Sequence, residues 1–231
     1  MASVAATSCY RASVRSAVLI LVALIACKSS GGDQGGAGSG PSVAAEAGAK
    51  PNVSADDQSR FDQERQPEQI VRALQLKPGM VVADVGAGTG LLTVHVARAI
   101  YPGGRVVATD IDAAVLEYLS ARMEAAGFDS VVVPRKVTAA DPGLEAATYD
   151  LILLAQVDHY FDDRVAWITK AAPALKPGGR LAITNRVQHR APMFAAAESA
   201  GFQVVTEVND LSGRYVALFE RGPAAPAKGS P

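Results

Sequence analysis

Three glycines at alternate positions form the part of the sequence best suited to hold a ligand. They are Gly86, Gly88 and Gly90, and they directly follow the apolar run 80–85. Glycine has no Cβ atom, so the backbone can approach a ligand closely at these positions. The dinucleotide-binding fingerprint G-x-G-x-x-G would need glycine at position 91, which is Leu91. The spacing therefore argues against a dinucleotide, although the loop alone does not identify its ligand.

Two aspartates follow or precede other apolar runs and could bind a nucleoside. Asp110 ends the run 105–110, and its carboxylate can accept hydrogen bonds from both ribose hydroxyls. Nicotinamide-dependent enzymes also place an acid at this position, so Asp110 alone does not distinguish between the possible cofactors. Ile111 could lie against an adenine face. Asp141 could accept a hydrogen bond from the adenine amino group, or it could be an ordinary turn residue before Pro142.

His159 is the candidate for proton transfer. It follows the apolar run 149–155, and an imidazole titrates close to neutral pH, as a general base should. The alternative is that His159 or Tyr160 simply packs at the start of a helix. No metal site is expected, because the other histidines and the cysteines lack the spacing of metal ligands. These residues are His95, His189, Cys9 and Cys27.

Apolar runs of strand length alternate with helical patterns from about residue 59 onward. Such alternation predicts an α/β fold, a doubly wound parallel sheet with helices on both faces. The last two expected strands, 202–208 and 214–219, are separated only by residues 209–213. A parallel connection needs about a dozen residues or more. The last strand must therefore run antiparallel to its neighbour.

Residues 60–221 resemble the class I S-adenosylmethionine-dependent methyltransferase family. The resemblance covers nearly the whole predicted domain, and its motifs are specific when taken together. It rests on VADVGAGTG (82–90), VVATDID (106–112), Asp141, YDLILLA (149–155), LKPGGRLAI (175–183) and the paired closing strands.

The resemblance implies a Rossmann-like sheet of seven strands, mostly parallel with an antiparallel last strand, and S-adenosylmethionine as cofactor. Gly86, Gly88 and Gly90 would surround its methionine half. Asp110 would bind the ribose, and Asp141 would lie near the adenine. Asp84 would order the glycine loop and face the amino group, directly or through water.

The first residues indicate an export signal. The segment 1–26 contains basic Arg11 and Arg15, followed by a ten-residue apolar run that is too short to span a bilayer. It ends in Leu-Ile-Ala-Cys, which resembles the lipobox of bacterial lipoproteins, whose cysteine receives diacylglycerol. Cys27 is therefore the predicted lipidation site. The alternative is a plain secretory signal with a chance cysteine.

Composition divides the rest of the chain into three parts. Residues 27–57 are rich in Gly, Ser and Ala and are predicted to be a disordered tether. Residues 58–222 are the predicted methyltransferase domain, and 223–231 a disordered tail. The formal net charge is −1, and no basic stripe with interleaved aromatics occurs, so nucleic acid is not an expected partner. The sequence does not predict an oligomeric state.

The leading hypothesis is methyl transfer to a small-molecule or membrane-associated acceptor. An alternative is a non-catalytic, envelope-tethered module that binds a nucleoside ligand. A third is a nicotinamide oxidoreductase, against which the glycine spacing argues. The expected location is the bacterial cell envelope, lipid-anchored in the outer membrane or facing the periplasm. If the signal is not used, the expected location is the cytoplasm, where S-adenosylmethionine is made.

Overall fold

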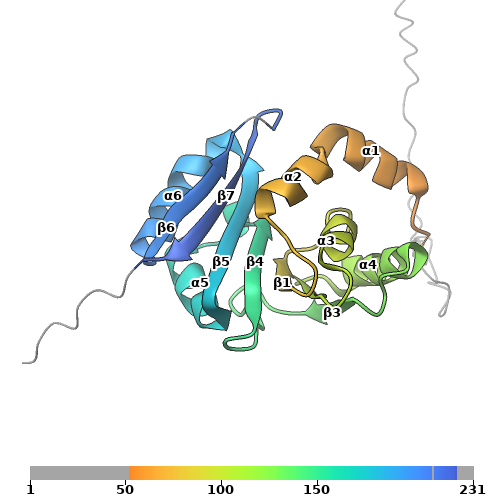
Figure 1. Ribbon diagram of the computed structural model, residues 1–231, viewed down its shortest axis with the longest axis horizontal. Coiled ribbons are helices and arrows are strands. Elements are labelled where there is room, and N and C mark those ends of the chain that lie inside the picture. The colour runs from red at the N-terminus through yellow and green to blue at the C-terminus, as the bar shows by residue number, and fades with distance from the viewer. Residues whose placement is uncertain (1–51, 210, 223–231) are drawn as a thin grey trace, which may run out of the picture. The chain divides into compact units, whose positions relative to one another are not determined.

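A computed structural model of the protein describes residues 52–209 and 211–222. Within this range the chain forms one seven-stranded sheet with helices on both faces (Figure 1). The predicted signal segment 1–26, Cys27 and the tail 223–231 lie outside the described residues. None of the helices in the described range is long and apolar enough to cross a bilayer.

The sheet has the strand order β3-β2-β1-β4-β5-β7-β6. Strands β1 to β5 pair in parallel, whereas β7 is antiparallel to both of its neighbours, β5 and β6. This confirms the predicted fold class and the antiparallel last strand. The strands are β1 (Val81–Val85), β2 (Arg105–Asp110), β3 (Val132–Lys136), β4 (Tyr149–Ala155), β5 (Leu175–Arg186), β6 (Phe202–Val208) and β7 (Arg214–Arg221).

The helices occur between the strands and before the first strand. They are α1 (Ala55–Arg65), α2 (Pro67–Leu74), α3 (Thr93–Ile100), α4 (Ala113–Ala126), α5 (Arg164–Ala171) and α6 (Arg190–Ser199), with short 3₁₀ turns η1 (Asp158–Tyr160), η2 (Ala172–Ala174) and η3 (Val187–His189).

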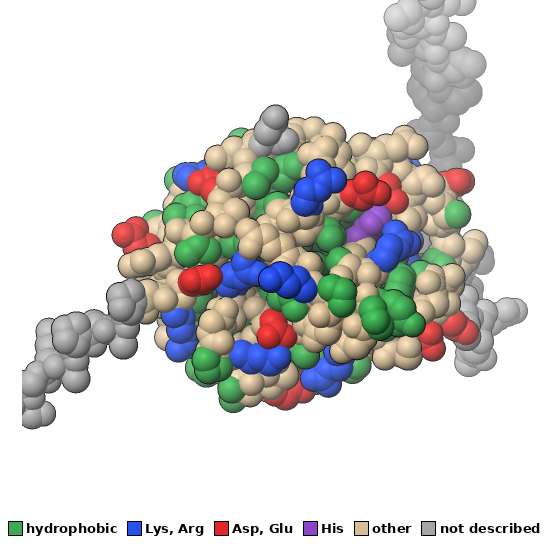
Figure 2. Space-filling model, in the orientation of Figure 1, with side chains coloured by type: hydrophobic (Ala, Val, Ile, Leu, Met, Phe, Trp, Pro, Cys, Tyr) green, Lys and Arg blue, Asp and Glu red, His purple; other side chains and the backbone are tan. Residues whose placement is uncertain are grey.

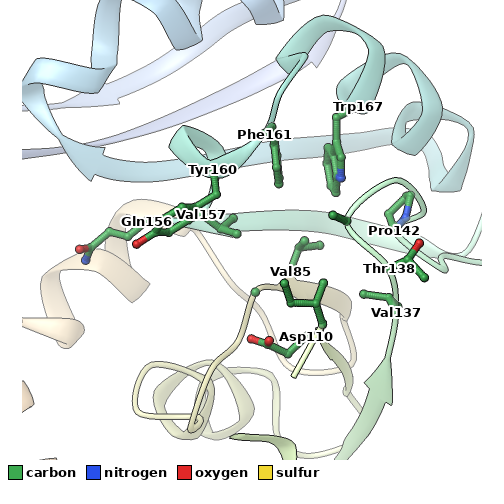
Figure 3. A pocket seen from close by; sticks show the side chains of 13 residues that line it. Val85, Asp110, Val137, Thr138, Pro142, Gln156, Val157, Tyr160, Phe161 and Trp167 are labelled. Carbon is green, nitrogen blue, oxygen red and sulfur yellow. The ribbon is translucent and has the colours of Figure 1, made fainter. Parts of the chain in front are cut away.

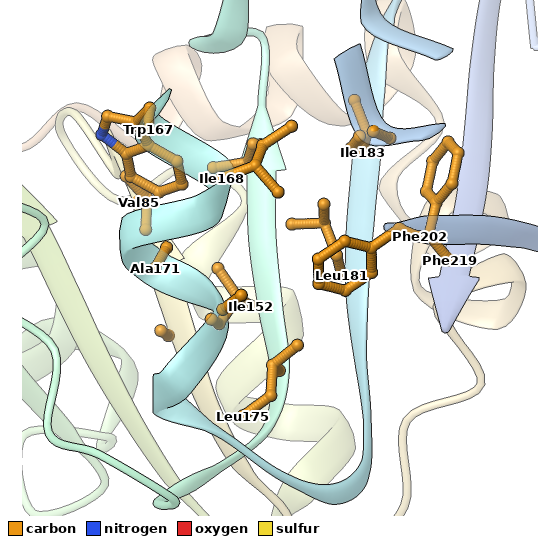
Figure 4. Packing of buried hydrophobic residues seen from close by; sticks show 14 of the residues in the cluster. Val85, Ile152, Trp167, Ile168, Ala171, Leu175, Leu181, Ile183, Phe202 and Phe219 are labelled. Atoms are coloured by element: carbon orange, nitrogen blue, oxygen red, sulfur yellow. The ribbon is translucent and has the colours of Figure 1, made fainter. Parts of the chain in front are cut away.

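Two apolar clusters, one on each face of the sheet, form the core. Alternate residues of the central strands point to opposite faces, so one cluster joins the sheet to α2, α3 and α4 and the other to α5 and α6. Figure 4 shows the second cluster, where Trp167, Ile168 and Ala171 of α5 lie over Val85 and Ile152. The carboxyl ends of β1, β2 and β4 are thereby held at one edge of the sheet.

Helix α1 corrects the predicted boundary between tether and domain. Its first turn is formed by residues 55–57, which the sequence analysis assigned to the tether. Ser54 caps the helix by accepting a hydrogen bond from the Asp56 amide at 3.1 Å. None of its residues is buried, so the sequence contains no apolar pattern that predicts this helix. Polar contacts attach it to the domain, including one of 3.1 Å from Gln58 Nε2 to the Leu91 carbonyl.

Charged side chains of both signs are interspersed on the face of the molecule seen in Figure 2. Apolar side chains lie between them in small groups rather than in one continuous patch. The histidine visible there lies beside acidic and basic groups. On this face, any ligand recognition must therefore come from local clusters of side chains and not from a broad field of one charge.

Candidate functional site

A cavity of about 370 Å³ lies at the carboxyl ends of β1, β2 and β4. This is where open α/β sheets bind their ligands. It brings together Gly86, Asp110 and Ile111, three of the residues predicted from the sequence. The full lining is Val85, Gly86, Asp110, Ile111, Val137, Thr138, Ala139, Pro142, Gln156, Val157, Tyr160, Phe161 and Trp167 (Figure 3).

The glycine loop turns sharply between β1 and α3. The amides of Gly86 and Ala87 both donate to the Thr109 carbonyl, at 2.8 and 3.0 Å. Gly86 has a φ of +68°, and a Cβ atom there would lie 2.5 Å from a methyl carbon of Val157. Only glycine therefore allows β1 and the segment after β4 to approach each other at the cavity.

Asp110 connects the glycine loop to the start of α4. One of its carboxylate oxygens accepts from the Gly88 amide and the other from the Asp112 amide, each at 3.0 Å. A carboxylate has about four lone-pair directions, so both oxygens keep acceptor capacity for the hydroxyls of a ribose. The arrangement fits a nucleoside cofactor held between the loop and Asp110.

Asp84 lies beneath the loop and does not line the cavity. Its side chain is 2% exposed, and its carboxylate accepts from the Thr93 hydroxyl at 2.7 Å. Burial raises its pKa to about 6, the hydroxyl opposes the rise, and the Asp110 charge adds to it. Since this folded-state pKa exceeds the unfolded value, Asp84 lowers stability as pH rises from about 4 to 6, and the cost persists above. An ionisable group kept at such a cost is typical of a binding site.

Asp141 is not among the residues that line the cavity, although Pro142 beside it is, and its role near the adenine stays a prediction. Its exposed carboxylate accepts from the Gly143 amide at 3.1 Å and lies 3.8 Å from the Lys170 ammonium. This is the turn role that the sequence analysis named as the alternative. Thr138 and Ala139 line the cavity in its place. The Thr138 hydroxyl is thus a polar group at the end of the cavity where adenine was expected.

Two aromatic rings that the sequence analysis did not single out form one wall of the cavity. The rings of Phe161 and Trp167 stack with 4.5 Å between centroids and 13° between planes. Figure 3 shows them side by side across the cavity from Val85 and Asp110. Trp167 comes from α5, far along the chain from the glycine loop, so only the fold brings it here.

His159 lies next to the cavity in a polar network. Its Nδ1 lies 3.1 Å from Asn185 Nδ2, which also donates to the fully buried Asp158 at 2.6 Å. The side-chain oxygen of Asn185, Oδ1, accepts a hydrogen bond from the backbone amide of Arg186, which fixes the orientation of the Asn185 side-chain amide. Nδ1 must therefore accept, and the imidazole proton lies on Nε2.

Burial and the nearby His189 lower the pKa of His159. Its ring stacks on that of His189 at 4.6 Å. A neutral His159 with its proton on Nε2 is a hydrogen-bond donor at that atom. The general-base role stays a prediction, and in this arrangement it would require the Nε2 proton to leave first.

Gln156 joins the cavity to α1. It lines the cavity, its φ is +57°, and its side-chain oxygen accepts from Arg65 Nη1 at 2.9 Å. Figure 3 shows its side chain extending away from Phe161 and Trp167.

Within residues 52–209 and 211–222, no group of three or more His, Cys, Asp or Glu side chains could hold a metal ion.

A family profile described as "Methyltransferase domain" matches residues 83–181. The segment runs from β1 into β5 and includes the glycine loop, Asp110 and the strand that precedes His159. The match therefore covers the strands and loops that form the cavity.

Curated relatives and a solved structure agree with this match. The chain is 35% identical over 147 residues to a ribosomal protein L11 methyltransferase of Pelotomaculum thermopropionicum, covering 63% of this chain and 45% of that protein. It is 32% identical over 111 residues to a nocamycin O-methyltransferase of Saccharothrix syringae, covering 48% and 39%. The chain thus spans less than half the length of either relative.

Among solved structures, a SAM-dependent methyltransferase from Aquifex aeolicus superposes with a TM-score of 0.64 at 19% identity. The match covers 73% of this chain and 98% of that one, and at this identity it shows the fold alone. The described residues therefore have the fold of the S-adenosylmethionine-dependent methyltransferases, and residues 83–181 match a methyltransferase domain.

Proposed function

We propose that the protein transfers the methyl group of S-adenosylmethionine to a small-molecule or membrane-associated acceptor. The observation that carries this proposal is the cavity that unites Gly86 of the glycine loop, Asp110 and the aromatic wall. These groups hold a nucleoside at one end and leave the other end free for an acceptor, near Gln156 and Tyr160.

The chain contributes positioning more than chemistry. When bound, S-adenosylmethionine supplies a methyl group on a sulfonium sulfur, which is already a good leaving group. Asp110 and the glycine loop fix the cofactor, so the acceptor needs only a short in-line approach. His159 Nε2–H can donate a hydrogen bond that orients the acceptor. A nucleophile without a proton at neutral pH would need no base.

The acceptor side of the cleft is open. Only η3 separates β5 from α6, so no long segment folds over the site between these elements. Tyr160 and Val187 are 76% and 51% exposed at this edge of the sheet. An open cleft suits an acceptor that is presented by a larger surface as well as one that is free in solution.

We expect S-adenosylhomocysteine to bind the full-length protein and to change its tryptophan fluorescence. Trp167 is the sole tryptophan of the chain and lines the cavity, so its emission reports on the site directly. Binding to the native state alone stabilises it by about 2.7 kcal/mol at a hundredfold excess over Kd. Fluorescence titration and thermal melting, with NAD as the comparison ligand, measure both effects.

Stabilisation by NAD with none by S-adenosylhomocysteine would contradict the methyltransferase proposal and favour the oxidoreductase. A non-catalytic module that binds a nucleoside ligand would give the same binding signals as an enzyme. Methyl transfer from labelled S-adenosylmethionine into extracts of the cell envelope distinguishes the two, because only the enzyme labels an acceptor.

We also propose that Cys27 is lipidated and anchors the protein in the bacterial envelope. The support is the sequence Leu-Ile-Ala-Cys at the end of a short apolar run. Acyl chains at this position would hold the domain at the membrane through the segment before α1. Two or more chains give lasting attachment, whereas a single chain gives only marginal binding.

Cys27→Ser is expected to release the protein from membranes without changing the fold of the domain. Cys9→Ser is the matched control, since these are the two cysteines of the chain, and it should leave the protein attached. Membrane fractionation with mass measurement of the N-terminus gives the result. A wild-type protein without acyl mass on Cys27, or with Met1 intact in the cytosol, would show that the anchor is not used.

A further inference from the structure

Two arginines lie directly opposite each other where β5 ends and β7 begins. Arg186 and Arg214 are Cα partners in the antiparallel register of these strands. Directly opposed residues project from the same face of a sheet, and like charges at such a pair are destabilising. The neighbouring apolar residues Val216 and Ala182 belong to the cluster under α2 and α3, so both arginines project on the face that α2 covers.

A third arginine reaches the same place from α1. Arg65 is the last residue of α1 and binds Gln156, which lines the cofactor cavity. Burial lowers its pKa, and the positive charges of Arg214 and Arg186 lower it further. Helix α2, which follows Arg65, packs against β7 (Figure 1). Arg65 therefore lies within electrostatic reach of both strand arginines, and it contacts the cavity lining through Gln156.

The carboxylate of Glu64, the residue before Arg65, opposes the charges of Arg186 and Arg214 on Arg65 only in part. Across residues 52–209 and 211–222, no carboxylate forms an ion pair with Arg65, Arg186 or Arg214. The Arg214 Nε atom is buried without a hydrogen-bond partner in the described range. A buried donor without a partner costs folding free energy, as does an opposed pair of like charges. Both costs would be offset by an anion bound between the arginines.

We propose that the methyl acceptor carries an anionic group, a carboxylate or a phosphate, which Arg65, Arg186 and Arg214 bind. This inference rests on the proposed methyl transfer and names the chemical class of its acceptor. A guanidinium group donates to a carboxylate or a phosphate through two parallel N–H bonds, which fixes orientation as well as affinity. The anionic group would hold the acceptor at the Gln156 end of the cavity.

The position of the arginines assigns the anion to the acceptor rather than to the cofactor. The glycine loop follows β1, whereas Arg186 and Arg214 lie on β5 and β7, beyond β4 in the sheet. Neighbouring strands are about 4.8 Å apart, so these backbones lie roughly 10 and 14 Å from β1. The charge of Arg186 also acts on His159, the side chain proposed to contact the acceptor.

Isothermal titration calorimetry of the full-length protein with inorganic phosphate and with malonate, at constant ionic strength, tests this inference. We expect binding of at least one probe, weakened tenfold or more by Arg186→Gln and by Arg214→Gln. Arg105→Gln is the matched control, because Arg105 is an exposed arginine at the opposite end of the sheet, where β2 begins, and it should bind like the wild type. The tighter probe identifies the anion as phosphate or carboxylate.

Two further measurements separate this inference from its alternatives. Affinity for S-adenosylhomocysteine should change less than twofold in both variants, whereas a parallel loss would show that the arginines hold the cofactor. The melting temperature without ligand should stay the same or rise in Arg186→Gln, because a like-charge contact is removed. A lower melting temperature would reveal a structural arginine. Absence of probe binding, or equal weakening by Arg105→Gln, would overturn the acceptor assignment even if S-adenosylhomocysteine binds as proposed.

Discussion

Gly86→Ala should lower the affinity for S-adenosylmethionine at least about a hundredfold, which corresponds to ~2.7 kcal/mol. The new Cβ would lie 2.5 and 2.9 Å from two carbons of Val157. Val157 must therefore move, and because it lines the cavity, its movement changes the shape of the site. The positive φ of Gly86 adds a cost of roughly 1–2 kcal/mol for any L-residue. Calorimetry with S-adenosylhomocysteine measures the loss.

Gly79→Ala is the control that separates the steric clash from backbone strain. Gly79 has a φ of +85°, and a Cβ atom there would meet nothing within 4 Å. It lies in the turn before β1, outside the cavity. This variant should lose roughly 1–2 kcal/mol of stability and bind S-adenosylhomocysteine like the wild type. If both variants bind with wild-type affinity, the close approach of Gly86 to Val157 is not needed for the site.

The sequence predicted the glycine loop and Asp110 because local pattern alone determines where they lie. An apolar run of strand length followed by a glycine-rich turn and a helix puts the turn at a carboxyl strand end. The run 105–110 puts Asp110 at the end of the adjacent strand by the same logic. Topology rules fix the rest of the sheet, including the antiparallel β7, since the short 209–213 link excludes a crossover.

Asp141 illustrates the limit of that logic. Asp141 was predicted to bind because an acid precedes the strand 149–155. The segment after β3, however, turns back between Thr138 and Asp141. The isolated bridge between Thr138 and Asp141 closes this turn, leaving Thr138 in the cavity and Asp141 outside. A displacement of three residues within a loop depends on its turn geometry, for which the sequence offers only the weak signal of Asp before Pro142.

The arginine cluster and α1 were not predicted for a different reason. Helix α1 buries no side chain, so its formation depends on capping and on polar contacts with distant segments. Its one local signal was Ser54 followed by Asp57, a capping-box pattern that could have placed its start. Arg186 and Arg214 become neighbours only through the pairing of β5 with β7. Such a pair can be recognised only after the strand register is known.

Asp110→Ala should weaken binding of S-adenosylhomocysteine by roughly 10²–10⁴-fold. Two hydrogen bonds from ribose hydroxyls to this carboxylate would be lost, and bonds to charged groups contribute about 1.5–3 kcal/mol each. The Gly88 and Asp112 amides would also lose their acceptor, so the glycine loop would be less well ordered before the cofactor arrives. Asp110→Asn should fall between wild type and Asp110→Ala, because one oxygen acceptor remains.

Asp141→Ala is the matched control, since it removes an aspartate that lies outside the cavity. Its effect on affinity should stay within about threefold, below 1 kcal/mol, because its carboxylate serves the turn and Lys170. Thr138→Val then tests the residue that takes its place, and a loss greater than that of Asp141→Ala would place the adenine against Thr138. Equal losses for Asp110→Ala and Asp141→Ala would mean that the ribose does not lie at Asp110.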